Sequence, residues 1–340
     1  MISFKSDYAQ GAHPRIMEAL LNFNMEHSDG YGADEHSKNA VRLIQQKIGR
    51  DCFVTLMAGG TLANLTVISH ALRQHQAVIS ADTGHIFTNE TGAIEATGHK
   101  VIACPGQDGK LTTQMIMKVL EGHRHVPHVV QPKLVYISQS TELGTLYSKE
   151  ELTAISGLCR QMGLYLYIDG ARLGSALAAL KDELTMADLA ALADAFTAGG
   201  TKNGALFGEA VIIPNSALAQ DFLFSVKQKG GLMARGSVLG IQFEQLFTDD
   251  LFIELGDHAN KMAKILKDAL VQARFKFYVD SPSNQQFVLV KNETAQTLSQ
   301  KYSIIVKPHD DNYSIVRLVT SWITTKEEVR ELIDYLVAGS

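Results

Sequence analysis

The stretch "LYLYIDG" (residues 164–170) decides the fold class, because it is an almost wholly apolar run that ends in an aspartate. Similar short, apolar and often β-branched runs recur along the chain, and segments with helical spacing of apolar residues separate most of them. These runs are "CFVTLMA" (52–58), "AVISA" (77–81), "KVIAC" (100–104), "KLVYISQS" (133–140) and "GEAVIIP" (208–214). Strands that alternate with helices predict an α/β fold, with a mostly parallel sheet that helices cover on both faces.

The pattern changes after about residue 247. A long helical stretch (251–273) leads into short strands, and the chain closes with the helical pattern "TKEEVRELIDYLV" (325–337). We therefore expect a large domain at 26–250 and a smaller α+β C-terminal domain at 251–340. The N-terminal segment, residues 1–25, is expected to pack with the smaller domain.

Composition narrows the class of protein. The 340 residues are 46% hydrophobic and 20% charged, with a formal net charge of −5, so no basic stripe predicts nucleic-acid binding. No apolar run approaches the length of a membrane span, and the start "MISFKSDYAQGAHP" lacks a signal-peptide core. Three cysteines (Cys52, Cys104 and Cys159) show no metal-site spacing. We expect a cytoplasmic protein with no metal, membrane or nucleic-acid partner.

A candidate phosphate site lies in "MAGGTLANLTVISHAL" (57–72). Gly59 and Gly60 turn the chain after a strand, and Thr61 begins a helix. Backbone N–H groups at a helix N-terminus bind anions, and glycines let the backbone approach a phosphate closely. An ordinary turn before a helix has the same pattern, so this motif does not decide the function by itself.

Two charged residues stand out in apolar surroundings. Asp169 ends its strand, where it is either a helix cap or the partner of a buried cation such as a protonated ring nitrogen. Lys202 lies between glycines in "FTAGGTKNGALFGEAVII" (196–213), where it is either a surface lysine or a desolvated one. Desolvation lowers the pKa of a lysine, and the neutral amine can form a Schiff base with an aldehyde.

The three features in this order supply what pyridoxal 5'-phosphate needs: a phosphate turn, an acid for the pyridine nitrogen and a lysine for the aldehyde. Their order and spacing resemble fold-type I pyridoxal-phosphate enzymes. Several longer pieces are similar to the threonine aldolase and aromatic amino acid β-eliminating lyase family, and within it to low-specificity L-threonine aldolases and phenylserine aldolase. They are "SDYAQGAHPRIMEAL", "DGYGADEHS", "GGTLANL", "ADTGHIFTNETGA", "HVVQPKLVYISQSTELGTLYSKEEL", "IDGARL" and "TKNGALFGEA".

The resemblance implies a role for each matching residue. The cofactor would be held by Gly60 and Thr61 at the phosphate, Asp169 at the pyridine nitrogen, Lys202 at the aldehyde and His85 against the ring, with Arg172 nearby. The substrate carboxylate would be bound by Ser6, Arg172 and Arg317. Lys202, His85 and His128 would be catalytic, although His128 also lies beside two other histidines in a loop-like stretch.

One segment, "KQKGGLMARGSVLG" (227–240), departs from the spacing of the simpler threonine aldolases. The resemblance implies a homodimer or homotetramer in which this segment reaches a neighbouring subunit's phosphate. Arg235 is the predicted contact, with Lys227 and Lys229 as alternatives.

The predicted activity is cleavage of L-threonine, L-allo-threonine or a related L-3-hydroxy amino acid such as phenylserine to glycine and an aldehyde. Two alternatives stay open. One is β-elimination or transamination on the same scaffold; the other is a non-catalytic α/β protein that binds a phosphorylated ligand at the 59–61 turn.

Overall fold

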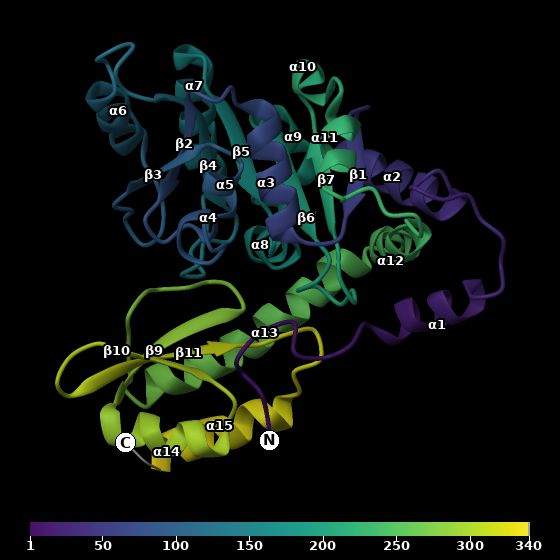
Figure 1. The fold of residues 1–340 in the computed structure, drawn as a ribbon. Coiled ribbons are helices and arrows are strands. Elements are labelled where there is room, and N and C mark those ends of the chain that lie inside the picture. The colour runs from purple at the N-terminus through teal and green to yellow at the C-terminus, as the bar shows by residue number, and fades with distance from the viewer. Residues whose placement is uncertain (339–340) are drawn as a thin grey trace.

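A seven-stranded sheet forms the centre of the computed structural model, which describes residues 1–338 (Figure 1). Its strand order is β1-β7-β6-β5-β4-β2-β3. Strand β7 is antiparallel to both β1 and β6, and the other neighbouring strands pair in parallel, so the mostly parallel α/β sheet is confirmed. The strands are β1 (Phe53–Met57), β2 (Gln76–Ala81), β3 (Lys100–Cys104), β4 (Gln131–Ser138), β5 (Tyr165–Asp169), β6 (Ala195–Gly199) and β7 (Glu209–Ile213).

Helices cover both faces of this sheet, which explains why its strands are apolar along their whole length. One face packs against α3, α4, α5, α10 and α11, and the other packs against α2, α6, α7, α8, α9 and α12. The helices are α1 (Pro14–Phe23), α2 (Glu35–Ile48), α3 (Gly60–Ala71), α4 (His85–Thr88), α5 (Ala93–Ala96), α6 (Thr113–Gly122), α7 (Lys149–Met162), α8 (Leu173–Leu180), α9 (Met186–Leu192), α10 (Ser216–Ala219), α11 (Phe222–Gln228) and α12 (Ser237–Phe247).

A second, antiparallel sheet of four strands, in the order β10-β11-β9-β8, has its own core. The long helix α13 runs from the first sheet to the second, as Figure 1 shows, and α14 and α15 complete the layer. The bounds are α13 (Leu251–Gln272), β8 (Lys276–Phe277), β9 (Gln285–Lys291), α14 (Asn292–Lys301), β10 (Ile305–Pro308), β11 (Tyr313–Val319) and α15 (Lys326–Ala338).

The N-terminal segment contacts both parts of the molecule. Phe4 is buried in the core of the second sheet, and its N–H donates to the carbonyl oxygen of Ser303 at 2.8 Å. Helix α1 instead packs against α12, where Arg15 donates to Gln245 at 3.1 Å. The exact division into 1–25, 26–250 and 251–340 stays a prediction.

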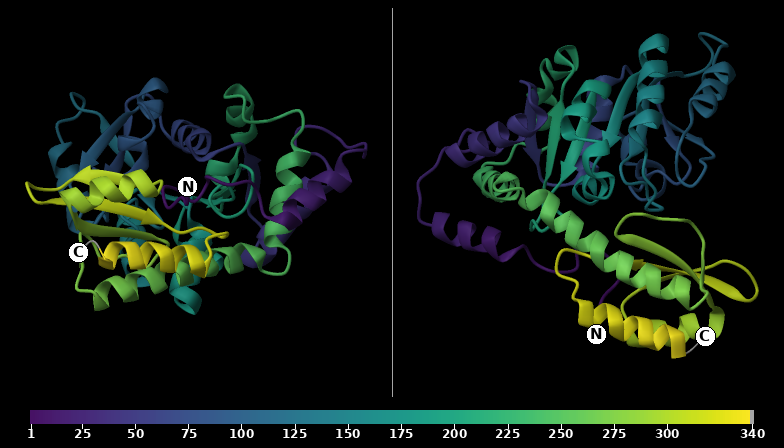
Figure 2. Two further views of the ribbon diagram at one scale, coloured as in Figure 1. Left: turned by 90° about the horizontal axis from the view of Figure 1, so that it is seen from below. Right: turned by 180° about the vertical axis from the view of Figure 1, so that it is seen from behind.

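The topology positions the candidate site. Parallel strands end at one edge of a sheet, and Ser138 at the end of β4 lies in register with Asp169 at the end of β5. Figure 2 shows from two further directions that the four-stranded sheet lies beyond this edge. Among residues 1–338, no helix is both long and apolar enough to cross a membrane.

Candidate active site

A cavity of about 330 Å³ lies at the carboxyl ends of the parallel strands. It is bounded by the turn between β1 and α3, the ends of β4 and β5, helix α4 and the loop between β6 and β7. The cavity is therefore built where the topology of an α/β sheet favours ligand binding. Six of the predicted site residues line it: Gly60, Thr61, His85, Asp169, Arg172 and Lys202.

Asp169 is buried and fully engaged by hydrogen-bond donors. Its Oδ2 accepts from the Tyr136 hydroxyl at 2.6 Å and from Asn64 Nδ2 at 2.9 Å, and its Oδ1 accepts from the N–H of Ala171 at 2.9 Å. Burial raises the pKa of Asp169, but these hydrogen bonds and the charges of His85 and Lys202 outweigh burial and bring the pKa below its usual value. The site therefore holds a carboxylate anion next to the cavity.

The turn that carries Lys202 is held rigidly. The N–H of Gly200 donates to Gly208 O at 2.9 Å, and Asn203 Nδ2 donates to Phe252 O at 2.7 Å. Gly204 has φ +87, a left-handed conformation that favours glycine. Burial lowers the pKa of Lys202, and the Arg172 charge lowers it further. Within residues 1–338 the Lys202 amine has no hydrogen-bond or ion-pair partner, which favours its neutral, nucleophilic form.

His85 is oriented by an acid that sequence reasoning missed. Its Nδ1 lies 2.7 Å from Glu90 Oε1, and the same oxygen accepts from Asn64 at 2.8 Å. Burial lowers the pKa of His85, but the hydrogen bond to Glu90 and the charges of Asp169 and Glu90 raise it above the usual value. Because Nδ1 is engaged by Glu90, Nε2 is the ring nitrogen left for a ligand in the cavity.

Arg172 is paired with Asp7, which was not predicted. Its Nε and Nη2 donate to the two carboxylate oxygens at 2.7 and 3.0 Å, and Asn284 donates to Asp7 at 3.0 Å. Arg317, on β11, donates from Nη2 to Gln285 at 2.7 Å, while its buried Nε has no partner among residues 1–338. Burial lowers the pKa of Arg317 to about 10, and the nearby Arg172 charge contributes. Arg317 therefore lies near Arg172, with a free donor group, although it does not line the cavity.

Three other predicted residues are not brought to the cavity of this chain. Ser6 precedes Asp7 but does not line the cavity. His128 is exposed and stacks on His125 in the loop before β4, at the opposite edge of the sheet from Asp169. Arg235 is exposed between α11 and α12.

The two alternatives to Arg235 lie in the same region. Lys227 is exposed with its amine over the ring of Tyr31, 4.3 Å from the centroid, and Lys229 is half-buried. These cations and His128 can therefore contact such a cavity only in a neighbouring copy of the chain. The roles given to His128 and to residues 227–235 stay predictions.

Sequence reasoning also missed two acids of the cavity wall, the half-buried Glu142 and the buried Glu209. Glu142 accepts from Ser138 Oγ at 2.7 Å and from the His85 N–H at 2.9 Å, and burial raises its pKa. Glu209 begins β7; burial and the Asp169 charge raise its pKa to about 8. Within residues 1–338, no group of three or more histidine, cysteine or acidic side chains is arranged to hold a metal ion.

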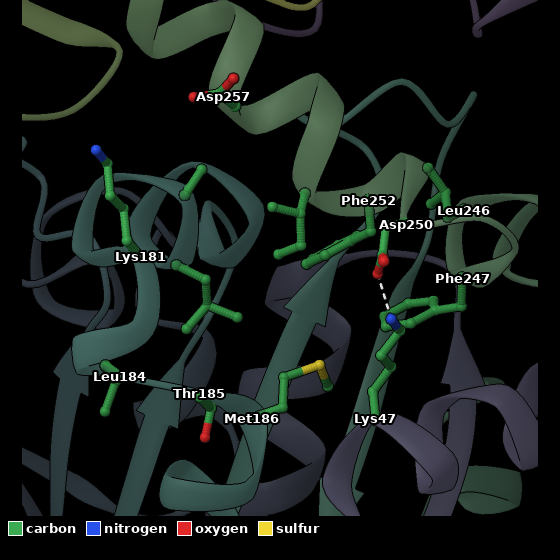
Figure 3. A pocket seen from close by; sticks show the side chains of 13 residues that line it. Lys47, Lys181, Leu184, Thr185, Met186, Leu246, Phe247, Asp250, Phe252 and Asp257 are labelled. Carbon is green, nitrogen blue, oxygen red and sulfur yellow. Dashed lines mark hydrogen bonds and ion pairs between the residues drawn. The ribbon is translucent and has the colours of Figure 1, made fainter.

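A second cavity, of about 540 Å³, is lined by residues of α8, α12 and the start of α13 (Figure 3). Its lining is mainly apolar, with Met186, Phe247 and Phe252 pointing inward. Two of its charged side chains, Lys47 and Asp250, pair with each other. No nucleophile, acid and base converge there, so the cavity at the strand ends is the better candidate for chemistry.

A family model described as a beta-eliminating lyase matches residues 3–293. The chain is 31% identical to a low-specificity L-threonine aldolase of Pseudomonas aeruginosa, over 97% of this chain and 95% of that protein. It is 47% identical to the solved structure of a Leishmania major threonine aldolase, with a TM-score of 0.97 over 99% of this chain and 98% of that one.

A more distant structure bears on the fold alone. An aspartate aminotransferase of Thermus thermophilus is 12% identical, with a TM-score of 0.72, over 100% of this chain and 92% of that one. The predicted fold-type I architecture is confirmed by these structural neighbours.

Proposed function

The chain belongs to the beta-eliminating lyase family, and we propose that it is a pyridoxal-phosphate-dependent aldolase within that family. The proposed reaction cleaves L-threonine, L-allo-threonine or a related L-3-hydroxy amino acid such as phenylserine to glycine and an aldehyde. One observation carries the proposal: the unpaired amine of Lys202 and the buried carboxylate of Asp169 line one cavity. The threonine aldolases to which the chain is similar support the choice of substrate.

The residues of the cavity fit pyridoxal phosphate. No side chain caps the N-terminus of α3, so the backbone N–H groups at Gly60 and Thr61 are available to hold a phosphate. Asp169 would hold a protonated pyridine nitrogen, and Lys202 would hold the aldehyde carbon. When bound, this cofactor acts as an electron sink that lets a bond at the substrate Cα break.

The two arginines would bind the substrate carboxylate. Arg317 has an unpaired, buried Nε, and a guanidinium binds a carboxylate through a planar pair of donors. Arg172 is already bound by Asp7, which fixes its orientation and leaves fewer of its N–H groups for a substrate. We assign the carboxylate contact to both residues: Arg172 lines the cavity, and Arg317 lies near it with an unpaired donor group.

His85 is the best-supported base within one chain. When the Cα–Cβ bond of a 3-hydroxy amino acid breaks, the β-hydroxyl loses its proton as its oxygen becomes the aldehyde oxygen. His85 lines the cavity and is held by Glu90, so its Nε2 is the atom proposed to accept that proton. His128 could act instead only if a neighbouring subunit's loop brings it to the site, and a water molecule held by one of these histidines is a further alternative.

A substrate panel tests the proposal against its alternatives. The purified protein with pyridoxal phosphate should release glycine from L-threonine, L-allo-threonine or phenylserine. Ammonia and a keto acid from thiol amino acids would instead indicate β-elimination, and amino transfer to keto acids would indicate an aminotransferase. A colourless protein that neither takes up the cofactor nor turns over any of these substrates would support a non-catalytic phospholigand-binding protein.

We further propose that the protein acts in the cytoplasm as a homodimer or homotetramer. The segment 227–235 supports assembly, because its three cations, the exposed Lys227 and Arg235 and the half-buried Lys229, contact no acidic partner among residues 1–338. Its suggested contact is a phosphate in the neighbouring subunit, with Arg235 as the preferred residue.

A further inference from the structure

Glu209 is a buried acid of the cavity to which the proposed reaction gives no task. Its residue is 3% exposed, and it lines the cavity with Gly59, Gly60 and Lys202. Among residues 1–338, no group donates a hydrogen bond to either carboxyl oxygen, and Oε2 is completely buried without a partner. An ionised carboxylate in such a position is costly, whereas a protonated one is much less so.

The sheet register fixes where this side chain points. Glu209 pairs with Met57 on β1 and with Gly199 on β6, and it shares its face of the sheet with Val211. Met57 and Val211 both belong to the core that packs under α3. The Glu209 carboxyl group therefore lies beneath the start of α3, at the turn that leads out of β1.

The distance to that turn is short. A Cβ atom added to Gly60 would lie 3.8 Å from Glu209 Oε1. The first-turn N–H groups of α3 nevertheless do not donate to Glu209, so the side chain does not act as a helix cap. An anion held by these N–H groups would therefore lie next to a carboxyl group that has no hydrogen-bond partner of its own.

The charges around the carboxyl group favour its neutral form. Asp169 faces it from β5, and the Tyr167 hydroxyl lies on the same strand. Lys202 faces it from the loop between β6 and β7, and its charge lowers the pKa of Glu209. His85 and Arg172 line the cavity from α4 and from the turn before α8, but each is held by an acid. A phosphate would add roughly −1.5 to −2 charges to this group of acids.

We propose that Glu209 is a neutral carboxylic acid that donates a hydrogen bond to the phosphate bound at the N-terminus of α3. That this phosphate belongs to the cofactor rests on the proposed function. Phosphate binding then requires Glu209 to be protonated, because an ionised Glu209 would repel the anion. Where Glu209 is ionised before binding, it takes up a proton from solvent as the phosphate binds, and this uptake approaches one proton as the pH rises above the acid's pKa.

The sign and size of the effect follow from the acid's pKa of about 8. A phosphate stabilises the protonated form, so affinity is greatest below this pKa and falls as pH rises through it. Between pH 7 and pH 9 the neutral fraction falls from roughly nine-tenths to roughly one-tenth, which predicts about tenfold weaker phosphate binding at pH 9.

The test is calorimetric titration of the full-length protein, freed of cofactor, with inorganic phosphate at pH 7 and pH 9. Between pH 7 and pH 9, the phosphate affinity of the wild type should fall about tenfold more than that of Glu209→Gln. The amide of this variant keeps a hydrogen-bond donor but cannot ionise. Lys202 titrates in both proteins, so its effect largely cancels in this ratio. Glu142→Gln is the matched control, because Glu142 is a second, half-buried acid of the cavity with its own hydrogen bonds, and this variant should keep the wild-type pH dependence.

Equal pH dependence of phosphate binding in the wild type and Glu209→Gln would overturn the proposal. So would loss of this dependence in both Glu209→Gln and Glu142→Gln, or a wild type that binds no phosphate at pH 7. Infrared difference spectra of the wild type give a second measurement should Glu209→Gln fail to fold. Phosphate added at pH 9 should increase the carbonyl band of a protonated carboxyl group, and an unchanged band contradicts the proposal. Phosphate binding does not depend on aldol cleavage, so a protein that binds as described but releases no glycine refutes only the proposed function.

Discussion

Replacing Asp169 by asparagine separates a catalytic acid from a simple turn cap. The carboxylate has one acceptor oxygen facing Tyr136 and Asn64 and the other facing the N–H of Ala171. An amide must place its NH₂ group at one of these positions, where it meets hydrogen-bond donors. The variant therefore loses at least one buried hydrogen bond, worth about 1–3 kcal/mol of stability.

The effect on turnover should be larger than this structural cost. Loss of one partner from a buried ion pair costs about 3–5 kcal/mol, which at about 1.36 kcal/mol per tenfold corresponds to two to four orders of magnitude in rate. We expect kcat for threonine cleavage to fall by this amount at saturating pyridoxal phosphate. Absorbance of the bound cofactor, measured on the same samples, separates slower chemistry from lower occupancy.

Asp194→Asn is the matched control. Asp194 accepts two hydrogen bonds, from the Leu166 N–H at 2.8 Å and from Asn215 at 2.7 Å, but it lies at the opposite ends of β5 and β6. This control should lose comparable stability while keeping kcat. An Asp169→Asn protein with full cofactor occupancy and a near-normal rate would show that Asp169 merely caps the turn at Ala171.

Three further outcomes are expected. Lys202→Ala should abolish turnover, and borohydride should attach the cofactor to Lys202 in the wild type; a label on another lysine would contradict the assignment. Glu90→Gln should move the acidic limb of the kcat/KM profile to lower pH, because Glu90 raises the pKa of His85, and an unmoved limb would remove His85 as the base. Sedimentation should show at least a dimer, and a fully active monomer would refute the shared site. Arg235→Ala should weaken cofactor binding without dissociating the subunits.

Most strands could be predicted because burial on both faces leaves a local signal. The run at 100–104 coincides with β3 (Lys100–Cys104), and "LYLYIDG" contains β5 (Tyr165–Asp169). Strand β6, "AFTAG", is absent from the predicted runs. Its two alanines and its glycine have weak β-propensity, and it becomes a strand because it pairs with β5 and β7.

The candidate site could be predicted only in part. Lys202 and Asp169 could be found because a charge next to an apolar strand is unusual in a sequence. Glu142 gave no comparable signal, because an acid in a polar loop is ordinary until its burial is known. His128 shows the opposite limit: its motif matched the family, yet within one chain the loop before β4 lies at the far edge of the sheet.

The sequence by itself determined the alternation of strands and helices and the order of phosphate turn, aspartate and lysine after their strands. These are local properties, since they depend on apolar periodicity and on residues adjacent in the chain. The tertiary structure decided which charges meet: Asp7 binds Arg172 across 165 positions, and Glu209 reaches the turn at Gly60 through the pairing of β7 with β1. Such contacts depend on which distant segments converge at the strand ends, and no spacing within the chain encodes that convergence.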